Sequence, residues 1–173
     1  MKPLETIKKF DQYLKAQNLS FKGVIIGGSA LSILGVITRE TQDCDILDPN
    51  IPENVQEAAK NFAKKQGLEH DWLNNGPDSL KRDLPKGWRL RLQSLFEGEA
   101  LNLQTLGRSD LLATKLFAYC DRGFDLADCL KLNPTQNELK DAKVWVSKQD
   151  ANPDWPDHVE EMFKNILDQL SKG

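Results

Sequence analysis

The chain has 173 residues, of which 39% are hydrophobic and 28% charged, and it carries a net charge of −3 at pH 7 with a pI of about 5.5. This length and composition predict one globular unit with a full core, and the acidic balance argues against strong binding of duplex DNA. Because no apolar run approaches the length of a membrane span and the first residues do not lead into a signal-peptide core, we expect a cytoplasmic protein with no membrane association. The three cysteines lack zinc-type spacing and are expected to be small core residues: Cys44, Cys120 and Cys129.

The chain begins with a predicted helix, a strand and a glycine turn. Apolar residues recur every three or four positions over residues 3–17, which predicts an amphipathic helix. The β-branched stretch over residues 21–26 predicts a buried strand. Gly27 and Gly28 can then turn tightly and let a phosphate approach the backbone, and Ser29 is expected to cap the short helix that follows. Because anions bind at such helix starts, we expect nucleotide phosphates here.

An acidic pair, Asp43 and Asp45, lies in the next predicted strand, over residues 43–47. Side chains two residues apart in a strand point to the same face, so these two carboxylates would lie side by side and repel each other. A divalent cation between them removes that repulsion, and Mg²⁺ prefers oxygen ligands. We therefore predict that Asp43 and Asp45 bind Mg²⁺. The alternative interpretation is a solvated strand end with ordinary turn acids.

The rest of the chain predicts strands and then helices. We expect a helix over residues 53–66 that ends at Gly67, a loop with short helical pieces over 70–88, and paired strands over 89–92 and 101–106. Helices are predicted from Ser109, which is expected to act as a cap, and over 124–130, 137–148 and 159–170. This order predicts an α+β fold, with an α/β core over residues 1–108 and a helical section over 109–173, packed as a single compact unit.

Two blocks of residues resemble a known superfamily. The turn Gly27-Gly28-Ser29, a helix and a strand with Asp43-x-Asp45 resemble the signature of the DNA polymerase beta-like nucleotidyltransferases. With Arg39-x-Thr41 before the acidic pair, the pattern is most similar to the bacterial branch that includes the abortive-infection nucleotidyltransferase toxins. A second block is similar to the Lys-helix and Arg/Asp motif of that branch: Ser109 to Leu116 with Lys115, then Asp121-Arg122, Asp125 and Asp128.

The resemblance implies an activity and a set of site residues. The activity would be transfer of a nucleoside monophosphate from a nucleoside triphosphate to a hydroxyl of a protein or RNA acceptor, with one or two Mg²⁺ ions. The implied catalytic residues are Asp43, Asp45, Lys115, Asp121 and Asp125. The implied nucleotide-binding residues are Gly27, Gly28, Ser29, Arg39, Thr41 and Arg122. Three alternatives stay open: Arg39 as a salt-bridge partner of the acidic pair, and Lys115 as a lysine that snorkels to the surface. The third is that the charged residues over 121–128 only pair with one another at helix ends and give no catalytic support.

The sequence departs from the superfamily pattern at its third carboxylate. That acid lies on an adjacent strand and often acts as general base, but the candidate strands near residues 89–94 and 100–105 carry Gln93, Asn102 and Gln104 and no acid at their centres. We expect one acid from elsewhere to approach the pair: Glu99, Asp110, Asp121 or Asp125. A second hypothesis is therefore a catalytically lapsed fold that acts as a nucleotide sensor or partner-binding module. A third hypothesis is a component of a toxin–antitoxin or phage-defence system.

Overall fold

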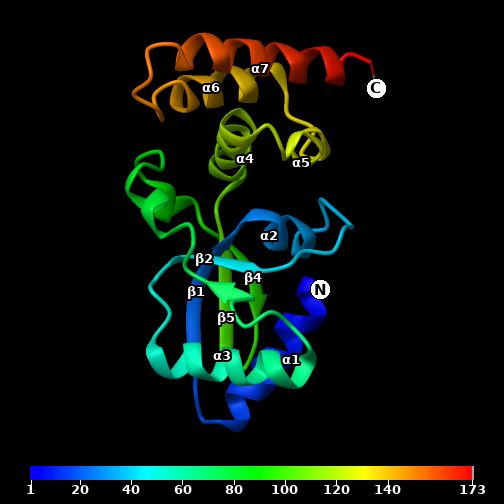
Figure 1. Cartoon of the computed structure of the whole chain (residues 1–173), viewed down its shortest axis with the longest axis vertical. Coiled ribbons are helices and arrows are strands. Elements are labelled where there is room, and N and C mark those ends of the chain that lie inside the picture. The colour runs from blue at the N-terminus through cyan, green and yellow to red at the C-terminus, as the bar shows by residue number, and fades with distance from the viewer. Residues whose placement is uncertain (173) are drawn as a thin grey trace. The chain divides into compact units, whose positions relative to one another are not determined.

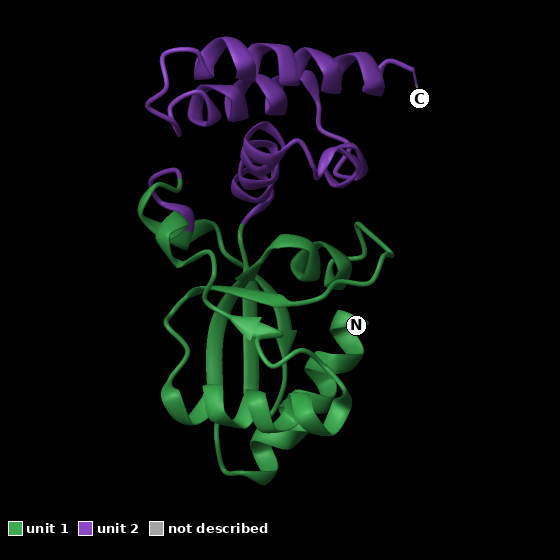
Figure 2. Ribbon diagram, in the orientation of Figure 1, with its two compact units in different colours: residues 1–84, 89–106 green, residues 85–88, 107–173 purple. Residues whose placement is uncertain are grey.

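The computed structural model describes residues 1–172, and its chain divides into two compact units. The first unit comprises residues 1–84 and 89–106, and the second comprises residues 85–88 and 107–173 (Figure 2). The sequence predicted a boundary between residues 108 and 109, close to the point where the chain passes from the first unit to the second.

The first unit is a mixed sheet with helices, drawn in Figure 1, and its strand order is β3-β2-β1-β5-β4. The strands are β1 (Phe21–Ile26), β2 (Cys44–Asp48), β3 (Leu73–Asn74), β4 (Gln93–Glu97) and β5 (Leu101–Thr105). The helices are α1 (Pro3–Ala16), α2 (Gly27–Ile33) and α3 (Glu53–Gln66), with a 3₁₀ turn η1 (Asp78–Arg82). Together with the helices of the second unit, this sheet confirms the predicted α+β fold.

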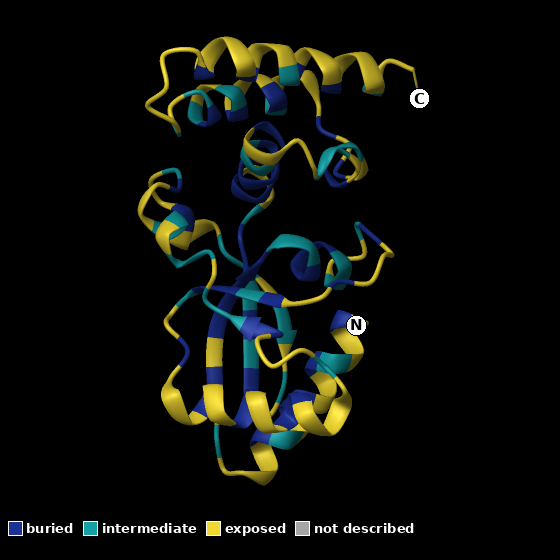
Figure 3. Ribbon diagram, viewed as in Figure 1, coloured by how far each residue is buried: buried dark blue, intermediate teal, exposed yellow. Residues whose placement is uncertain are grey.

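α1 and α3 pack on one face of this sheet through an aromatic core. Phe10 of α1, Phe62 of α3 and Trp72 lie with their ring centroids 5.1 to 5.6 Å apart. All three side chains are buried, whereas the outer sides of both helices are exposed (Figure 3). The Trp72 ring nitrogen donates to the carbonyl of Ala59 at 3.1 Å, so its polar group is satisfied inside the core.

The second unit is helical. It contains α4 (Arg108–Arg122), α5 (Leu126–Lys131), α6 (Gln136–Val146) and α7 (Trp155–Leu170). α6 begins with a capping box, in which Thr135 accepts from the backbone of Glu138 and the Glu138 carboxylate accepts from the backbone of Thr135. Among the described residues, no helix combines the length and the apolar composition that crossing a membrane requires.

Three local predictions were wrong. The strand expected over residues 89–92 is part of a 3₁₀ turn, η2 (Trp88–Arg91), and β4 begins only at Gln93. The alternation of polar and apolar residues at Arg89, Leu90 and Arg91 suggested a half-buried strand, but Leu90 is 92% exposed and does not pack in the core. Ser109 is not a cap, since α4 begins one residue earlier after Gly107. The third is Ser29, which lies inside α2 instead of at its start.

A buried carboxylate connects α1 to the turn between β4 and β5. Asp11 is 3% exposed, and its Oδ1 accepts from the backbone N–H groups of Ala100 and Leu101, each at 2.8 Å. A side chain at Gly98 would overlap this oxygen, so only glycine fits in the turn. Burial raises the pKa of Asp11, but hydrogen bonds from the backbone of Ala100, Leu101 and Glu99 outweigh it and hold the pKa below its ordinary value.

We predict that Asp11 contributes measurably to stability. Asp11→Ala should lower the free energy of unfolding by about 3 kcal/mol, because two buried N–H groups lose a charged acceptor. Asp11→Asn keeps one acceptor oxygen and should cost about 1 kcal/mol. Urea denaturation measures both, with the exposed Glu57→Gln on α3 as the control.

The same residue makes a pH dependence testable. Because the folded-state pKa is depressed, the charge of Asp11 stabilises the fold fully above its ordinary pKa of 3.8 and this contribution is lost as the pH falls through the lower folded-state value. The stability difference between wild type and Asp11→Asn should therefore shrink below that pH. A difference that grows on acidification would contradict this assignment.

Candidate functional site

The register of the sheet brings three strand ends to one edge. β1 and β2 are antiparallel with Ile26 opposite Asp45, whereas β1 and β5 are parallel with Val24 opposite Gln104. The carboxyl ends of β1 and β5 therefore meet the amino end of β2. Since paired residues and residues two apart share a face, Asp45 and Gln104 lie on the same face of the sheet.

This face is the one that α1 and α3 do not cover. Ile25 and Ile46, which pair with each other and alternate with Ile26 and Asp45, belong to the core beneath the two helices. Asp45 is half-buried on the opposite face, and Asp43, directly before β2, is exposed. The acidic pair is thus accessible from solvent at the start of its strand.

The glycine turn lies against this strand start. Gly27 has a φ of +76°, and a Cβ at this position would lie 3.0 Å from Oδ2 of Asp45. A Cβ at Gly28 would lie 3.2 Å from Cγ2 of Thr41 and 3.4 Å from Nη2 of Arg39. The structure therefore brings together five predicted site residues, with bare backbone on one side and a carboxylate and a guanidinium on the other.

Ser29 braces the loop that leads into β2. Its side chain is 2% exposed, and its hydroxyl donates to the carbonyl of Asp43 and hydrogen-bonds to the Thr41 hydroxyl at 2.8 Å. α2 begins at Gly27, which has the left-handed conformation, three residues before the start expected with Ser29 as the cap, so the Ser29 hydroxyl binds the loop instead of capping the helix. Contact between Ser29 and a nucleotide phosphate stays a prediction.

Cys44, between the two aspartates, is a core residue. Burial is the main cause that raises the pKa of its thiol to about 12; a hydrogen bond with Ser29 opposes the rise, and the neighbouring Asp45 and Asp43 add to it. At neutral pH the thiol is protonated and is a poor nucleophile. All three cysteines are buried and free, as predicted.

Two carboxylates suit Mg²⁺, which commonly takes one or two protein carboxylates together with substrate phosphates and water. Within residues 1–172, no group of three histidine, cysteine, aspartate or glutamate side chains gathers as a metal site. On β5 the residue that faces the same side as Asp45 is Gln104. Glu99 lies before the start of β5, at the other end of the sheet, where it pairs with Lys15. Of the acids expected to approach, Glu99 therefore does not.

One segment near Asp45 was missed by the sequence analysis. β3 runs parallel to β2 and pairs Asn74 with Asp45, and a Cβ at Gly76 would lie 4.0 Å from Oδ1 of Asp45. Asn75 fixes this segment, since its amide donates to the carbonyl of Ile46 at 2.9 Å. The run Asn-Asn-Gly-Pro signalled a turn, but no sequence rule placed that turn beside the acidic pair.

The second predicted block forms a buried charge cluster within the second unit. Lys115, 6% exposed, donates to Asp125 and to Asp128, each at 2.9 Å. Arg122 donates to the other oxygen of Asp125 at 3.0 Å. Two cations therefore balance two carboxylates, and Lys115 does not snorkel to solvent. Asp121 is exposed. The catalytic roles implied for Lys115, Asp121 and Asp125 stay predictions.

We predict that Gly27 and Gly35 respond differently to alanine. Their φ values, +76° and +75°, strain an alanine equally, at a cost of about 1 kcal/mol each. At Gly27 the new methyl also meets Asp45, whereas nothing lies within 4 Å at Gly35. Gly27→Ala should therefore be the less stable variant in urea denaturation, and it alone should weaken Mg²⁺-dependent nucleotide binding. Equal effects on both measurements would show that the contact with Asp45 is unimportant.

The Lys115 cluster provides a second test. Lys115→Met should lower the free energy of unfolding by about 3 kcal/mol, because two buried carboxylates lose their shared cation. Lys131→Met, on the exposed side of α5, should change it by less than about 0.5 kcal/mol. Thermal and urea denaturation measure both. Similar losses in the two variants would mean that the ion pairs contribute nothing beyond the aliphatic stem.

The comparison with known proteins identifies one family. The family described as "Nucleotidyltransferase of unknown function (DUF6036)" matches residues 2–131. This span contains the glycine turn, the acidic pair and the whole Lys115 cluster. No curated protein and no solved structure matches the chain. Because the match covers three quarters of the sequence, the chain belongs to this nucleotidyltransferase family of unknown function.

Proposed function

We propose that the chain transfers a nucleoside monophosphate from a nucleoside triphosphate to a hydroxyl of a protein or RNA acceptor. The observation that supports this most directly is the position of the Asp45 carboxylate against the turn at Gly27, with the Arg39 guanidinium at Gly28. A triphosphate that approaches the bare backbone would meet both a metal-binding carboxylate and a cation. Phosphoryl transfer depends on this combination of positioning and charge stabilisation.

In this proposal Asp43 and Asp45 hold Mg²⁺. The bound ion supplies neutralisation of phosphate charge and polarisation of the transferred phosphoryl group. Arg39 binds a phosphate oxygen, and the absence of side chains at Gly27 and Gly28 allows close approach. The hydroxyls of Ser29 and Thr41 hold the backbone at Asp43 before the substrate arrives, which orients that carboxylate.

The roles that we propose for residues of the second unit follow from the family resemblance. Asp125 holds Lys115 and Arg122 together through both of its oxygens. We assign catalytic support to Lys115, Asp121 and Asp125 and nucleotide contact to Arg122. The similarity to the abortive-infection branch extends the proposal to a cytoplasmic enzyme of a toxin–antitoxin or phage-defence system.

A second candidate function is a catalytically lapsed nucleotidyltransferase that senses nucleotide or binds a partner. One observation favours it: the residue on β5 that shares the face of Asp45 is Gln104, and Asn102 precedes it on that face, so neither supplies a carboxylate. Transfer chemistry needs a base for the attacking hydroxyl or a further metal ligand. Nucleotide binding does not.

We predict that incubation of the protein with radiolabelled nucleoside triphosphates, Mg²⁺ and cell extract labels an acceptor. Asp43→Asn and Asp45→Asn should each reduce labelling by about a thousandfold or more, because the metal that stabilises the transition state loses a ligand. Asp71→Asn, an exposed acid of the same unit, serves as the control and should leave labelling unchanged. Chelation of Mg²⁺ should abolish labelling.

A nucleotide titration distinguishes the two functions. Labelling that depends on Asp45 supports the transferase. Mg²⁺-dependent binding of nucleotide with no labelling would replace the enzyme by the nucleotide sensor. If nucleotide neither binds nor labels an acceptor, the transferase and the nucleotide sensor are both excluded, and only partner binding is left of the second function.

A further inference from the structure

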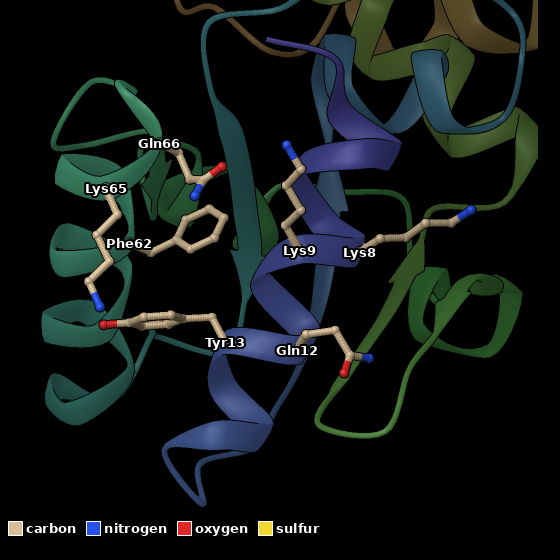
Figure 4. Close-up of a pocket in the computed structure, with 7 residues that line it drawn as sticks. All are labelled: Lys8, Lys9, Gln12, Tyr13, Phe62, Lys65 and Gln66. Atoms are coloured by element: carbon tan, nitrogen blue, oxygen red, sulfur yellow. The ribbon is translucent and has the colours of Figure 1, made fainter.

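α1 and α3 form a groove on their exposed side, away from the candidate site. The groove has a volume of about 520 Å³ and is lined by Lys8, Lys9, Tyr13, Phe62 and Lys65 together with two glutamines (Figure 4). A smaller hollow of about 160 Å³ shares Lys9 and Phe62 with it and extends it along the same two helices. The sheet separates this groove from the acidic pair, which lies on its other face.

The floor of the groove is aromatic. Tyr13 reaches from α1 toward α3, and Phe62 reaches from α3 toward α1, with their ring centroids 5.5 Å apart (Figure 4). Phe62 is 2% exposed, whereas Tyr13 is half-buried and packs against the edge of the core cluster. This floor is an apolar surface that another apolar side chain could cover.

The rim of the groove carries positive charge that is not neutralised. Among the described residues, no carboxylate pairs with Lys8, Lys9 or Lys65, and the Lys65 ammonium lies over the face of Tyr13, 5.0 Å from the ring centroid. Some lysines elsewhere do pair with carboxylates, as Lys15 does with Glu99 and Lys143 with Glu160, whereas the three around the groove do not. In a chain with a net charge of −3, this gathering of unpaired lysines around an apolar floor is a local reversal of charge.

The chemistry of the groove favours a peptide over a nucleic acid. Bases of single strands bind by stacking on exposed aromatic faces. Here Lys65 covers one face of Tyr13, and Phe62 is too deeply buried to offer a face. An aliphatic side chain needs only an apolar floor, and carboxylates beside it would meet the lysines of the rim. Two neighbouring helices also form the kind of groove into which an amphipathic helix packs.

We propose that the groove between α1 and α3 binds an acidic amphipathic helix of a partner protein. Its apolar side packs on Tyr13, the accessible ring of the floor, and its carboxylates pair with Lys8, Lys9 and Lys65. The proposal does not depend on nucleotide transfer, because none of these residues lies on the face of the sheet that carries the acidic pair.

The experiment uses the full chain, labelled with ¹⁵N, and a synthetic helical peptide of 14 residues, the length of α1, with leucines on one side and glutamates on the other. Two matched peptides replace the glutamates by lysines or the leucines by serines. Oligothymidylate is the nucleic-acid probe. Fluorescence anisotropy measures affinity, and amide chemical shifts locate the contact.

The Glu/Leu peptide should bind and shift amides of α1 and α3, and both matched peptides should bind more weakly. The double variant Lys9→Glu with Lys65→Glu should weaken binding by about tenfold, because two attractive contacts become repulsive. The control, Lys64→Glu with Lys164→Glu, makes the same change in net charge at exposed positions outside the groove and should bind as wild type does.

Four results would overturn the proposal. They are no binding of the Glu/Leu peptide, equal binding of either matched peptide, equal loss in the two double variants, and shifts in α1 and α3 with oligothymidylate but not with the peptide. The last result would make the groove a nucleic-acid site instead.

Discussion

The central strand β1 is hydrogen-bonded to an antiparallel neighbour on one side and a parallel neighbour on the other, and the candidate site depends on this arrangement. The antiparallel pairing puts the start of β2, and with it Asp45, beside the end of β1. The glycine turn follows β1 directly, so its backbone and the carboxylate come within contact distance although Asp45 lies eighteen positions after Gly27. A slip of one residue in the β1–β2 register would turn Asp45 into the core beneath α1 and α3.

The charged side chains fall into two groups, buried charges that have partners within the protein and exposed charges that do not need them. Buried charges are compensated: Asp11 by backbone N–H groups, and Lys115 by two carboxylates. This is required, because an unpaired charge in a core costs several kcal/mol. The exposed Asp43 and the lysines of the α1–α3 groove face no such requirement. The partners that we propose for them lie outside the chain, a cation for the first and an anion for the second.

The sequence predicted those helices and strands whose formation depends on residues close together in the chain. Apolar periodicity located α1 and the β-branched run located β1, because each buries a face against the core. Gly67 marked the end of α3, where it adopts the left-handed conformation of a C-cap. The acidic pair and the glycine turn were recognisable because each is a short motif of neighbouring residues in the sequence. The sequence could not reveal the anchor at Asp11, whose partners lie 89 and 90 residues away, nor the hydroxyl bond from Ser29 to the loop. Both depend on tertiary contacts between segments that carry no shared motif.

The alkylation rates of the buried cysteines can measure, separately in each unit, how often the local structure opens to solvent. Cys44 lies in β2 of the first unit, whereas Cys120 and Cys129 lie in α4 and α5 of the second, and burial raises the pKa of all three thiols to about 12. A protonated, buried thiol is alkylated only when its element opens to solvent. The alkylation rate of Cys44 therefore measures how often the strand that carries Asp45 exposes its core side. A ligand bound by that strand would slow the alkylation of Cys44. The two thiols of the second unit would react at their former rate if the ligand binds only the first unit.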